Sequence, residues 1–475
     1  MGFTWLLVEW IIRLVMVPVI LRRRFAPTTS LAWLSVIFFV PELGLIFYLL
    51  IGSPRLARRR VRLYRRAIRR FRSDTRLDSQ QEHVLRPDIE AAHRPTILQA
   101  EQISGMPILG GNEVELMADN DQTIERLVAD IDATEHHVHL VYYIFVPDET
   151  GQRVGDALRR AVRRGVSCRL LADAAGSRAF FLRRSLARKL KEDGVEVHPA
   201  LPVRLLRRRL QRLDLRNHRK LTVVDGRIAY AGSQNVVNVD YGHERAGKFV
   251  DLTARFTGPV VLQLQTVFLE DWLFETDQNL KTPDILPAPT VMGAIAAQAV
   301  PTGPSRESET LLRVTISAVN AARRRIIITS PYLVPDEPTL LALTMAAGRG
   351  VEVDLVIPQR SDHPLVNAAG RAYFDPLLEA GINIYLHKRG MLHAKTMTVD
   401  DSLALLGSSN FDIRSFYLNF ELNVLLYGSR ITQVLRFAQS RYISDSDRVE
   451  LDQWRCRPLI SRYLNSAASL LSPLL

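Results

Sequence analysis

Along most of the chain, hydrophobic and polar residues follow two patterns, one typical of β-strands and the other of amphipathic helices. The first half contains an apolar strand, an amphipathic helix that ends at a glycine, and a second strand, in residues 136–146, 155–165 and 166–173. The second half repeats this order in residues 323–334, 340–350 and 351–358. Strands that alternate with amphipathic helices are typical of α/β layers around a parallel or mixed sheet. The pattern therefore predicts two α/β regions of similar design.

Short identical or similar segments mark an internal repeat. The segment "VPDE" occurs twice, "RRGV" returns as "GRGV", and "DGVEVHPA" returns as "AGINIYLH", always 185 to 188 residues later. Proline-rich segments at 282–290 and 300–305 lie between the copies and suggest a seam. We therefore expect a first α/β domain at residues 104–290 and a second at 291–475.

A longer motif is also present twice. Residues 217–235 read "NHRKLTVVDGRIAYAGSQN", and residues 392–410 read "LHAKTMTVDDSLALLGSSN". In both copies a lysine follows the histidine by two positions, an aspartate follows it by seven, and Gly-Ser-x-Asn ends seventeen positions after it. Histidine and lysine two apart project from the same side of a strand. A single copy would be weak evidence, but two copies in one register indicate a shared site.

Two histidines, two lysines and two asparagines suit the chemistry of a phosphodiester. Lysine and amide groups bind its anionic oxygens and the charge that spreads over them during displacement. One neutral histidine can attack phosphorus, and a second can donate a proton to the leaving oxygen and then accept one from the incoming alcohol. This scheme requires no metal or other cofactor, and we predict none.

These motifs resemble those of the phospholipase D superfamily. The resemblance extends over nearly the whole chain to the bacterial cardiolipin synthases, through "PELGLIFYLLIG", "GNEVELMADN", "NFDIRSFYLNFE" and the C-terminal "SLLSPLL". It implies two phospholipase D-like α/β domains with a pseudo-twofold interface and one active site between them. It also implies transfer of a phosphatidyl group between two phosphatidylglycerol molecules through a phosphohistidine, which gives cardiolipin and glycerol.

The resemblance also assigns roles to individual residues. His218 and His393 would be the nucleophile and the general acid and base, in an order that the motifs leave open. The remaining motif residues would be catalytic or would bind the phosphate: Lys220, Asp225, Lys395 and Asp400, and Ser233, Asn235, Ser408 and Asn410. The two aspartates would support the residues that contact the substrate and would not contact it themselves. Asp251 and Glu421 match the carboxylates that orient the histidines.

Two apolar segments precede the α/β regions. Residues 31–52 contain one ionisable group, Glu42, and residues 4–21 contain Glu9 and Arg13, which lie four positions apart and can pair on one helix face. They predict an N-terminal transmembrane hairpin within residues 1–54, followed by a basic linker at 55–103. Ten arginines in residues 55–72 place the catalytic body in the cytoplasm by the positive-inside bias. We therefore expect a multi-pass protein of the bacterial inner membrane.

The net charge of +12 does not indicate nucleic-acid binding. Residues 55–72 and 22–24 contain thirteen arginines, and without them the chain is close to neutral. The expected partners are anionic phospholipids, both phosphatidylglycerol and cardiolipin, and the membrane. A membrane-bound hydrolase that uses water as acceptor would carry the same motifs, and a nuclease of the superfamily or a non-enzymatic scaffold are weaker alternatives. Residues 202–216, an insertion before the first motif, also predict a basic interfacial helix.

Overall fold

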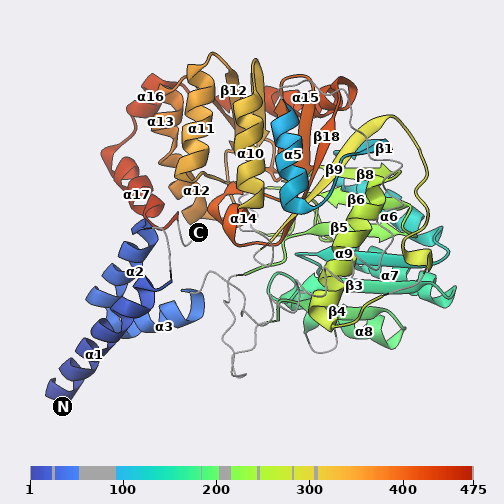
Figure 1. The fold of residues 1–475 in the computed structure, drawn as a ribbon, viewed down its shortest axis with the longest axis horizontal. Coiled ribbons are helices and arrows are strands. Elements are labelled where there is room, and N and C mark those ends of the chain that lie inside the picture. The colour runs from blue at the N-terminus through green and yellow to red at the C-terminus, as the bar shows by residue number, and fades with distance from the viewer. Residues whose placement is uncertain are drawn as a thin grey trace. The chain divides into compact units, whose positions relative to one another are not determined.

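The computed structural model describes residues 2–23, 27–52, 93–182, 185–202, 215–242, 247–280, 283–303 and 309–472. The described chain falls into an N-terminal helical part and an α/β body, each compact by itself (Figure 1). The arginine-rich segment 55–72 and most of the interfacial helix predicted over 202–216 lie outside the described residues.

Three helices form the N-terminal part: α1 (Gly2–Leu21), α2 (Pro27–Phe39) and α3 (Pro41–Ile51). They bury one small apolar cluster between them, which consists of Met16, Ile20, Trp33, Ile37 and Tyr48. The predicted pair of charged residues on α1 is confirmed, since Arg13 Nη2 lies 2.9 Å from Glu9 Oε2. Arg13 also donates to the carbonyl oxygen of Phe38 on α2 at 3.0 Å.

The second predicted membrane span is divided in the structure. Residues 31–52 do not form one helix, because α2 ends at Phe39 and α3 starts at Pro41. Proline has no backbone N–H and disfavours the helical conformation in the residue before it, and Val40 accordingly has φ −138° and ψ 72°. The two pieces are about 20 Å and 16 Å long, against about 30 Å of bilayer core. Among the described residues only Thr4–Leu21 is long and apolar enough to cross a membrane as one helix.

A fifteen-stranded mixed sheet forms the centre of the α/β body. The strands of the first half are β1 (Leu109–Met117), β2 (His137–Tyr142), β3 (Ser167–Asp173), β4 (Glu196–Ala200), β5 (Lys220–Val224), β6 (Ile228–Gly232) and β8 (Thr253–Thr257). Those of the second half are β9 (Ile295–Thr302), β10 (Arg325–Thr329), β12 (Glu352–Pro358), β13 (Asn383–His387), β15 (Thr396–Val399), β16 (Leu403–Gly407), β18 (Glu421–Tyr427) and β19 (Ser446–Arg448).

The strand order repeats outward from the middle of the sheet. On one side of the β1–β9 pair the order is β1-β8-β6-β5-β2-β3-β4, and on the other it is β9-β18-β16-β15-β10-β12-β13, with β19 at the edge. In both halves three strands run parallel, β2-β3-β4 and β10-β12-β13, and the motif strand β5 or β15 pairs antiparallel to the first of them. The chain therefore contains the same mixed α/β unit twice, as the repeat predicted.

Short strands and helices complete the body. The short strands are β7 (Phe249–Val250), β11 (Leu333–Val334), β14 (Met391–Leu392) and β17 (Phe411–Asp412). The helices of the first half are α5 (Arg94–Ser104), α6 (Asn120–Asp132), α7 (Glu149–Arg163), α8 (Leu186–Glu192) and α9 (Val260–Thr276), with the 3₁₀ turns η3 (Arg178–Phe181) and η4 (Pro283–Ile285). Those of the second half are α10 (Thr310–Ala321), α11 (Glu337–Gly348), α12 (Pro364–Arg371), α13 (Phe374–Glu379), α14 (Ile413–Tyr417), α15 (Ser429–Ser444), α16 (Leu451–Arg455) and α17 (Leu459–Ser469).

Helices cover both faces of the sheet (Figure 1). One hydrophobic cluster includes residues of α9, α15 and strands of both halves, such as Val223 and Leu406, so the two halves share a core. On the other face each half has its own cluster, under α6, α7 and α8 in the first half and under α5, α10, α11 and α13 in the second. Cys168 is buried in the cluster of the first half.

The repeated "VPDE" segment starts a helix in each half. The Asp148 carboxylate accepts a hydrogen bond from the backbone N–H of Gly151 at 2.9 Å, and Asp336 accepts one from Thr339 at 3.0 Å. These are N-cap bonds, which satisfy backbone donors that a helix leaves unpaired. After each of these helices a glycine with positive φ, Gly165 (91°) or Gly350 (84°), turns the chain back to the next strand.

The predicted basic linker is in part a folded element. Residues 94–103 belong to α5, which packs against α10 and β9. Its buried residues are Thr96, Ala100 and Ser104, spaced four apart on one face. Small side chains of this kind give a weak hydrophobic pattern, so the sequence did not reveal this packing. The predicted domain boundary near residue 290 falls in coil between η4 and β9, although the sheet continues across it.

A buried arginine within the first motif forms an ion pair in its own half and hydrogen bonds to the second half. The side chain of Arg219 is fully buried and forms a short contact with Asp271 on α9. The same guanidinium donates to the carbonyl oxygens of Thr302 at 2.9 Å and Glu421 at 3.1 Å, both in the second half. Removing one partner from a buried pair leaves an uncompensated charge, which costs about 3–5 kcal/mol.

Replacing Arg219 should therefore destabilise the α/β body. We expect Arg219→Met to lower the thermal unfolding midpoint of the detergent-solubilised protein by several degrees, and Arg219→Met/Asp271→Leu to recover much of that loss. The control is Arg188→Met, which breaks an exposed pair with Glu192 and should change the midpoint little. An unchanged midpoint for the single Arg219 variant would contradict this role.

Candidate active site

Both motif histidines lie just before a central strand and pair with the other half through the backbone. The His218 N–H donates to the carbonyl oxygen of Phe420 at 2.8 Å, and the His393 N–H donates to that of Val250 at 2.8 Å. The parallel pair β7–β14 aligns Val250 with Leu392. The next residue after Phe420 is Glu421, and the next after Val250 is Asp251. Each of these carboxylates therefore lies beside the histidine of the other half.

Each histidine consequently contacts a carboxylate from the other half. His218 Nδ1 lies 3.0 Å from Glu421 Oε2, and His393 Nδ1 lies 2.6 Å from Asp251 Oδ1. Asp251 and Glu421 are the two carboxylates that the sequence predicted to orient the histidines. The sequence did not indicate that they cross between the halves. Neither half has a complete histidine–carboxylate pair.

The carboxylates are held in their ionised form. Burial alone raises the pKa of Asp251, but His393, Lys395 and the Ser233 hydroxyl outweigh it and lower that pKa to about 2. Burial likewise opposes ionisation of Glu421, and His218, Lys220 and Ser408 still lower its pKa. An ionised carboxylate can only accept, so the neutral histidine bonded to it carries its proton on Nδ1. The lone pair on Nε2 is then available for attack or for proton transfer.

Burial also keeps both histidines neutral in the free protein. It lowers the pKa of His218 to about 4, against the opposing effect of Glu421, and the charge of Lys395 adds to the lowering. It lowers the pKa of His393 as well, with contributions from Lys395 and Lys220. Charges from both halves thus act on each histidine, as expected for one shared site. A bound anionic phosphodiester would raise these pKa values again, since an opposite charge favours the protonated form.

The two lysines lie on the same side of their strands as the histidines. Lys220 Nζ donates to the carbonyl oxygen of His218 at 2.7 Å, and Lys395 Nζ donates to that of His393 at 2.6 Å. Burial lowers the pKa of Lys220 well below its usual range and lowers that of Lys395 to about 8. A bound anion would favour the charged form of both lysines and would raise these pKa values.

The two motif serines lie behind the carboxylates. Ser233 Oγ donates to Asp251 Oδ1 at 2.7 Å, and Ser408 Oγ donates to Glu421 Oε2 at 2.5 Å. Each hydroxyl also accepts a backbone N–H, that of Leu252 or Leu422, at 2.9 Å. Their hydroxyl protons are therefore already used, which differs from the predicted phosphate-binding role. Instead, the serines fix the carboxylates that orient the histidines.

The motif asparagines retain capacity to donate. Asn235 Oδ1 accepts the backbone N–H of Ile144 at 3.1 Å, which leaves its amide hydrogens available. Asn410 Nδ2 donates to Asp412 at 3.0 Å, and its Oδ1 is buried without a protein partner. Both residues are almost fully buried, and one residue separates each of them from the Gly-Ser pair. Their predicted contact with the phosphate remains a prediction.

The motif aspartates lie at the opposite end of their strands. Asp225 follows β5 and accepts three backbone N–H bonds at 2.8–2.9 Å from residues 135–137, while Asp400 follows β15 and accepts three at 2.8–3.0 Å from residues 323–325. Both have positive φ, 51° and 49°, a conformation that aspartate tolerates better than most residues. Seven residues of extended chain separate each from its histidine, which corresponds to roughly 23 Å. The structure thus does not bring the predicted Asp225 and Asp400 to the reacting groups but gives them a role in fixing the strand turns.

Two aromatic residues that the motifs did not predict line the site. The Tyr143 ring lies edge-on to His218 with 4.7 Å between ring centroids, and the Phe249 ring lies 5.1 Å from His393. Lys220 Nζ lies 5.3 Å from the Tyr143 ring centre. A possible signal for Phe249 was its position two residues before Asp251. The aromatic rings limit the solvation of the histidines and so contribute to their low pKa values.

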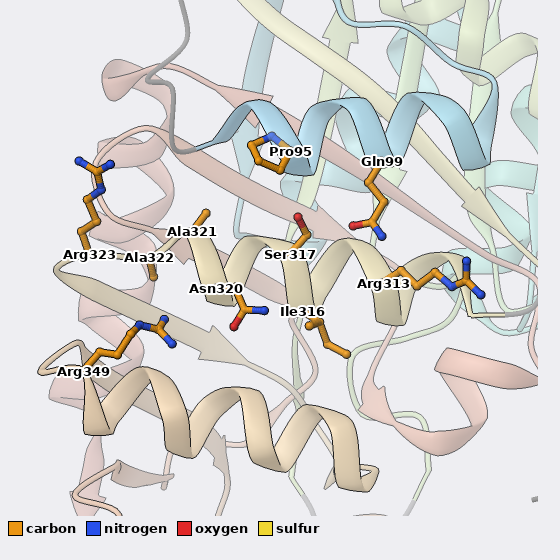
Figure 2. Close-up of a pocket in the computed structure, with 10 residues that line it drawn as sticks. All are labelled: Pro95, Gln99, Arg313, Ile316, Ser317, Asn320, Ala321, Ala322, Arg323 and Arg349. Atoms are coloured by element: carbon orange, nitrogen blue, oxygen red, sulfur yellow. The ribbon is translucent and has the colours of Figure 1, made fainter.

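A larger groove lies away from these residues. It has a volume of about 680 Å³ and lies between α5, α10 and α11 (Figure 2). It contains none of the predicted site residues. Two of its three arginines, Arg323 and Arg349, follow the ends of α10 and α11, where a cation complements the helix dipole. Within the part of the chain that the structure describes, no cluster of three or more His, Cys, Asp or Glu side chains could hold a metal ion.

Comparison with known proteins identifies the family of the chain. A family model described as "Cardiolipin synthase, PLD-like domain" matches residues 127–272 and 315–440, and so covers both halves. Cardiolipin synthase A of Serratia proteamaculans (strain 568) is 35% identical over 99% of this chain and 98% of its own length. Cardiolipin synthase A of Yersinia pseudotuberculosis serotype O:1b (strain IP 31758) is also 35% identical, over 99% and 97%. The chain belongs to the cardiolipin synthase family of the phospholipase D superfamily.

Membership of this family makes the chain a phosphatidyltransferase of the phospholipase D type with phospholipid substrates. A solved structure of similar fold is the crystal structure of phosphatidylserine synthase from Haemophilus influenzae Rd KW20. It has a TM-score of 0.60 and 14% sequence identity, and it covers 80% of this chain and 100% of its own. At this identity the likeness concerns the fold alone. It shows that the paired α/β arrangement described here occurs in another solved protein.

The pKa values predict a bell-shaped pH profile. For a short-chain phospholipid substrate, kcat/KM should rise as His218 loses its proton near pH 4. It should fall at higher pH, and the part of the fall above about pH 8 should come from loss of the charge on Lys395. Arginine keeps its charge at these pH values, so the fall above pH 8 should disappear in Lys395→Arg even if its rate is lower. The matched control Lys388→Arg, at an exposed lysine paired with Asp447, should keep the wild-type profile. A wild-type profile that stays flat from pH 6 to pH 10 would contradict the assignment to Lys395.

Proposed function

We propose that this chain is a cardiolipin synthase that transfers a phosphatidyl group between two phosphatidylglycerol molecules and releases glycerol. The main support is the crossed pair of contacts, His218 with Glu421 and His393 with Asp251. It provides two oriented imidazoles next to two buried lysines, which suits double displacement at a phosphodiester. Family membership supplies the substrate class.

In the first step His218 is the nucleophile. Its Nε2 lone pair attacks phosphorus, the bond from phosphorus to the glycerol headgroup oxygen breaks, and protonated His393 gives its proton to that oxygen. Glycerol leaves, and a phosphatidyl group remains on His218. Lys220 and Lys395 stabilise the charge on the phosphoryl oxygens, and the amides of Asn235 and Asn410 donate to them.

In the second step a second phosphatidylglycerol is the acceptor. Neutral His393 takes the proton from a hydroxyl of its glycerol headgroup, the oxygen attacks phosphorus, and the phosphorus–nitrogen bond breaks. Cardiolipin forms, His218 is regenerated, and His393 is protonated again for the next cycle. The reverse assignment of the two histidines uses the same contacts.

We further propose that a pseudo-twofold axis passes between β1 and β9. The strand order, which is the same in both outward directions, supports it. The crossed histidine–carboxylate pairs support it as well, because a twofold operation would exchange them. A single site on this axis would explain why the chain needs both copies of the motif.

The alternative is hydrolysis, with water in place of the second lipid. The described contacts fix the phosphate side of the site and leave the acceptor open. With phosphatidylglycerol vesicles, we expect the full-length protein to give cardiolipin and glycerol in equal amounts. Phosphatidic acid as the main product would show a hydrolase, and nicking of plasmid DNA would favour a nuclease.

Loss of either histidine should abolish transfer. We expect His218→Ala and His393→Ala to reduce turnover by at least roughly 10³-fold while the protein remains folded. His136→Ala, at an exposed histidine, is the matched control and should retain full activity. Acid quench of the wild-type protein during turnover, followed by peptide mass analysis, should locate the phosphatidyl group on His218. Its presence on His393 would reverse the assignment, and its absence from both would contradict the covalent mechanism.

We also propose that α1 and the divided segment α2–α3 anchor the chain in the inner membrane as a multi-pass protein, with the catalytic body in the cytoplasm. The excess of arginine after residue 52 supports this orientation. A cytosol-active reporter fused after Leu475 should be active, and the same position should be inactive with a periplasm-dependent reporter. The opposite result would overturn the orientation.

A further inference from the structure

We propose that the exposed apolar face of helix α17 docks on the surface of an anionic phospholipid bilayer beside the active site. This proposal rests on the proposed function for its lipid class. Helix α17 packs one side against α12, where Asn465 and Ala468 are buried (Figure 1). Its other side presents large apolar residues that nothing in the described α/β body covers.

The exposed side chains form a continuous stripe. Four of them are 61–70% exposed, and the stripe continues through two leucines directly after the helix; they are Leu459, Ile460, Tyr463, Leu464, Leu470 and Leu471. The spacing of three and four residues puts them on one face. Leu365 on the adjacent α12 is also 46% exposed. Exposed apolar patches of this kind mark interaction sites.

Charge distinguishes a lipid surface from an ordinary protein partner. Residues 457–471 contain two arginines, Arg457 and Arg462, and no acidic residue. Arg457 pairs with Asp375, whereas Arg462 is exposed on α17 itself. Arg360 is also exposed at the groove between α12 and α17. An apolar face with flanking arginines is the pattern of a helix that lies in the headgroup region of an anionic membrane.

The position of α17 ties this face to the active site. Helix α12 follows β12 at the carboxyl end of the parallel strands, where the Asp362 carboxylate accepts a hydrogen bond from Tyr332 Oη at 2.6 Å. Asp362 also acts on the pKa of Lys395. Gly370 on α12 lies directly against the backbone of Leu333 in β11, which pairs with β17 immediately after Asn410. The exposed stripe of α17 is therefore connected, through α12, to the ends of the strands where both lysines and both histidines lie.

The first half contributes apolar groups to the same edge. Tyr241 is 38% exposed and interacts electrostatically with Tyr143, which packs against His218. Leu182, 57% exposed, follows the turn after β3. A substrate with two acyl chains has to leave the bilayer in part to reach buried histidines. When these exposed apolar residues lie against the bilayer, the lipid crosses a shorter distance through water to reach the histidines.

The first test measures depth directly. In the full-length protein with Cys456→Ser, the remaining Cys168 is buried, so Leu464→Cys can carry a single spin label. In nanodiscs with phosphatidylglycerol, the label should be more accessible to oxygen than to a polar nickel reagent. The matched control is Phe437→Cys on α15, where the native side chain is 69% exposed, and it should be open to the nickel reagent.

Other occupants of the face give different results. Equal nickel accessibility at residues 464 and 437 would overturn the proposal. Protection from both reagents in detergent as well as in nanodiscs would also overturn it and would show a protein cover. In that case a label–label distance signal would identify a second copy, and its absence would identify the N-terminal helices. The accessibility measurement does not require catalysis. Product analysis on the same samples reports separately whether the proposed function fails.

The second test separates surface binding from chemistry. The variant Ile460→Ser/Tyr463→Ser/Leu464→Ser should reduce turnover on phosphatidylglycerol vesicles by roughly tenfold. Its turnover of a short-chain monomeric phosphatidylglycerol should change less than roughly twofold, because the site itself is unaltered. Val434→Ser/Phe437→Ser removes similarly exposed groups from α15 and should behave as wild type on both substrates. Equal loss on both substrates, or no loss on vesicles, would end the proposal.

Discussion

The hydrogen bond from each histidine to a carboxylate of the opposite half is the interaction on which the site depends. It fixes the ring, places the proton on Nδ1, and leaves Nε2 for chemistry. The backbone bonds from His218 to Phe420 and from His393 to Val250 set the distance before the side chains contribute. Because the pairs cross, neither half can assemble the site alone.

Burial gives the site its chemical character at an electrostatic cost. Burial makes the charged forms of both histidines and both lysines less stable, and their pKa values are lowered as a result. Ionised Asp251 and Glu421 offset this cost when the site is empty, and their own bonds to serines keep them ionised. In the proposed reaction the phosphodiester therefore meets two imidazoles that are already oriented, which need little reorganisation.

The architecture also explains why so much of the motif is structural. In the proposed mechanism the histidine, the lysine and the asparagine of each copy act on the phosphoryl group. The serine supports a carboxylate, and the aspartate, at the far end of the strand, fixes the turn that holds β5 or β15 against its neighbour. Arg219, between His218 and Lys220, uses the same segment to connect α9 with the second half. One short stretch of sequence thus carries catalysis, strand placement and contact between the halves.

The sequence by itself determined the repeated α/β order, the residues with phosphoryl chemistry and the carboxylates that belong with them. These follow from local periods of 2 and 3.6 residues and from two motifs in one register, which depend on near neighbours. Only the tertiary structure decided that Asp251 serves His393, 142 positions away, and that Glu421 serves His218, 203 positions away. Sheet register sets these pairings, and no local pattern encodes it. The exposed face of α17 likewise depends on what packs nearby, because an apolar residue does not specify its partner. The break at Pro41, by contrast, is a local effect of proline.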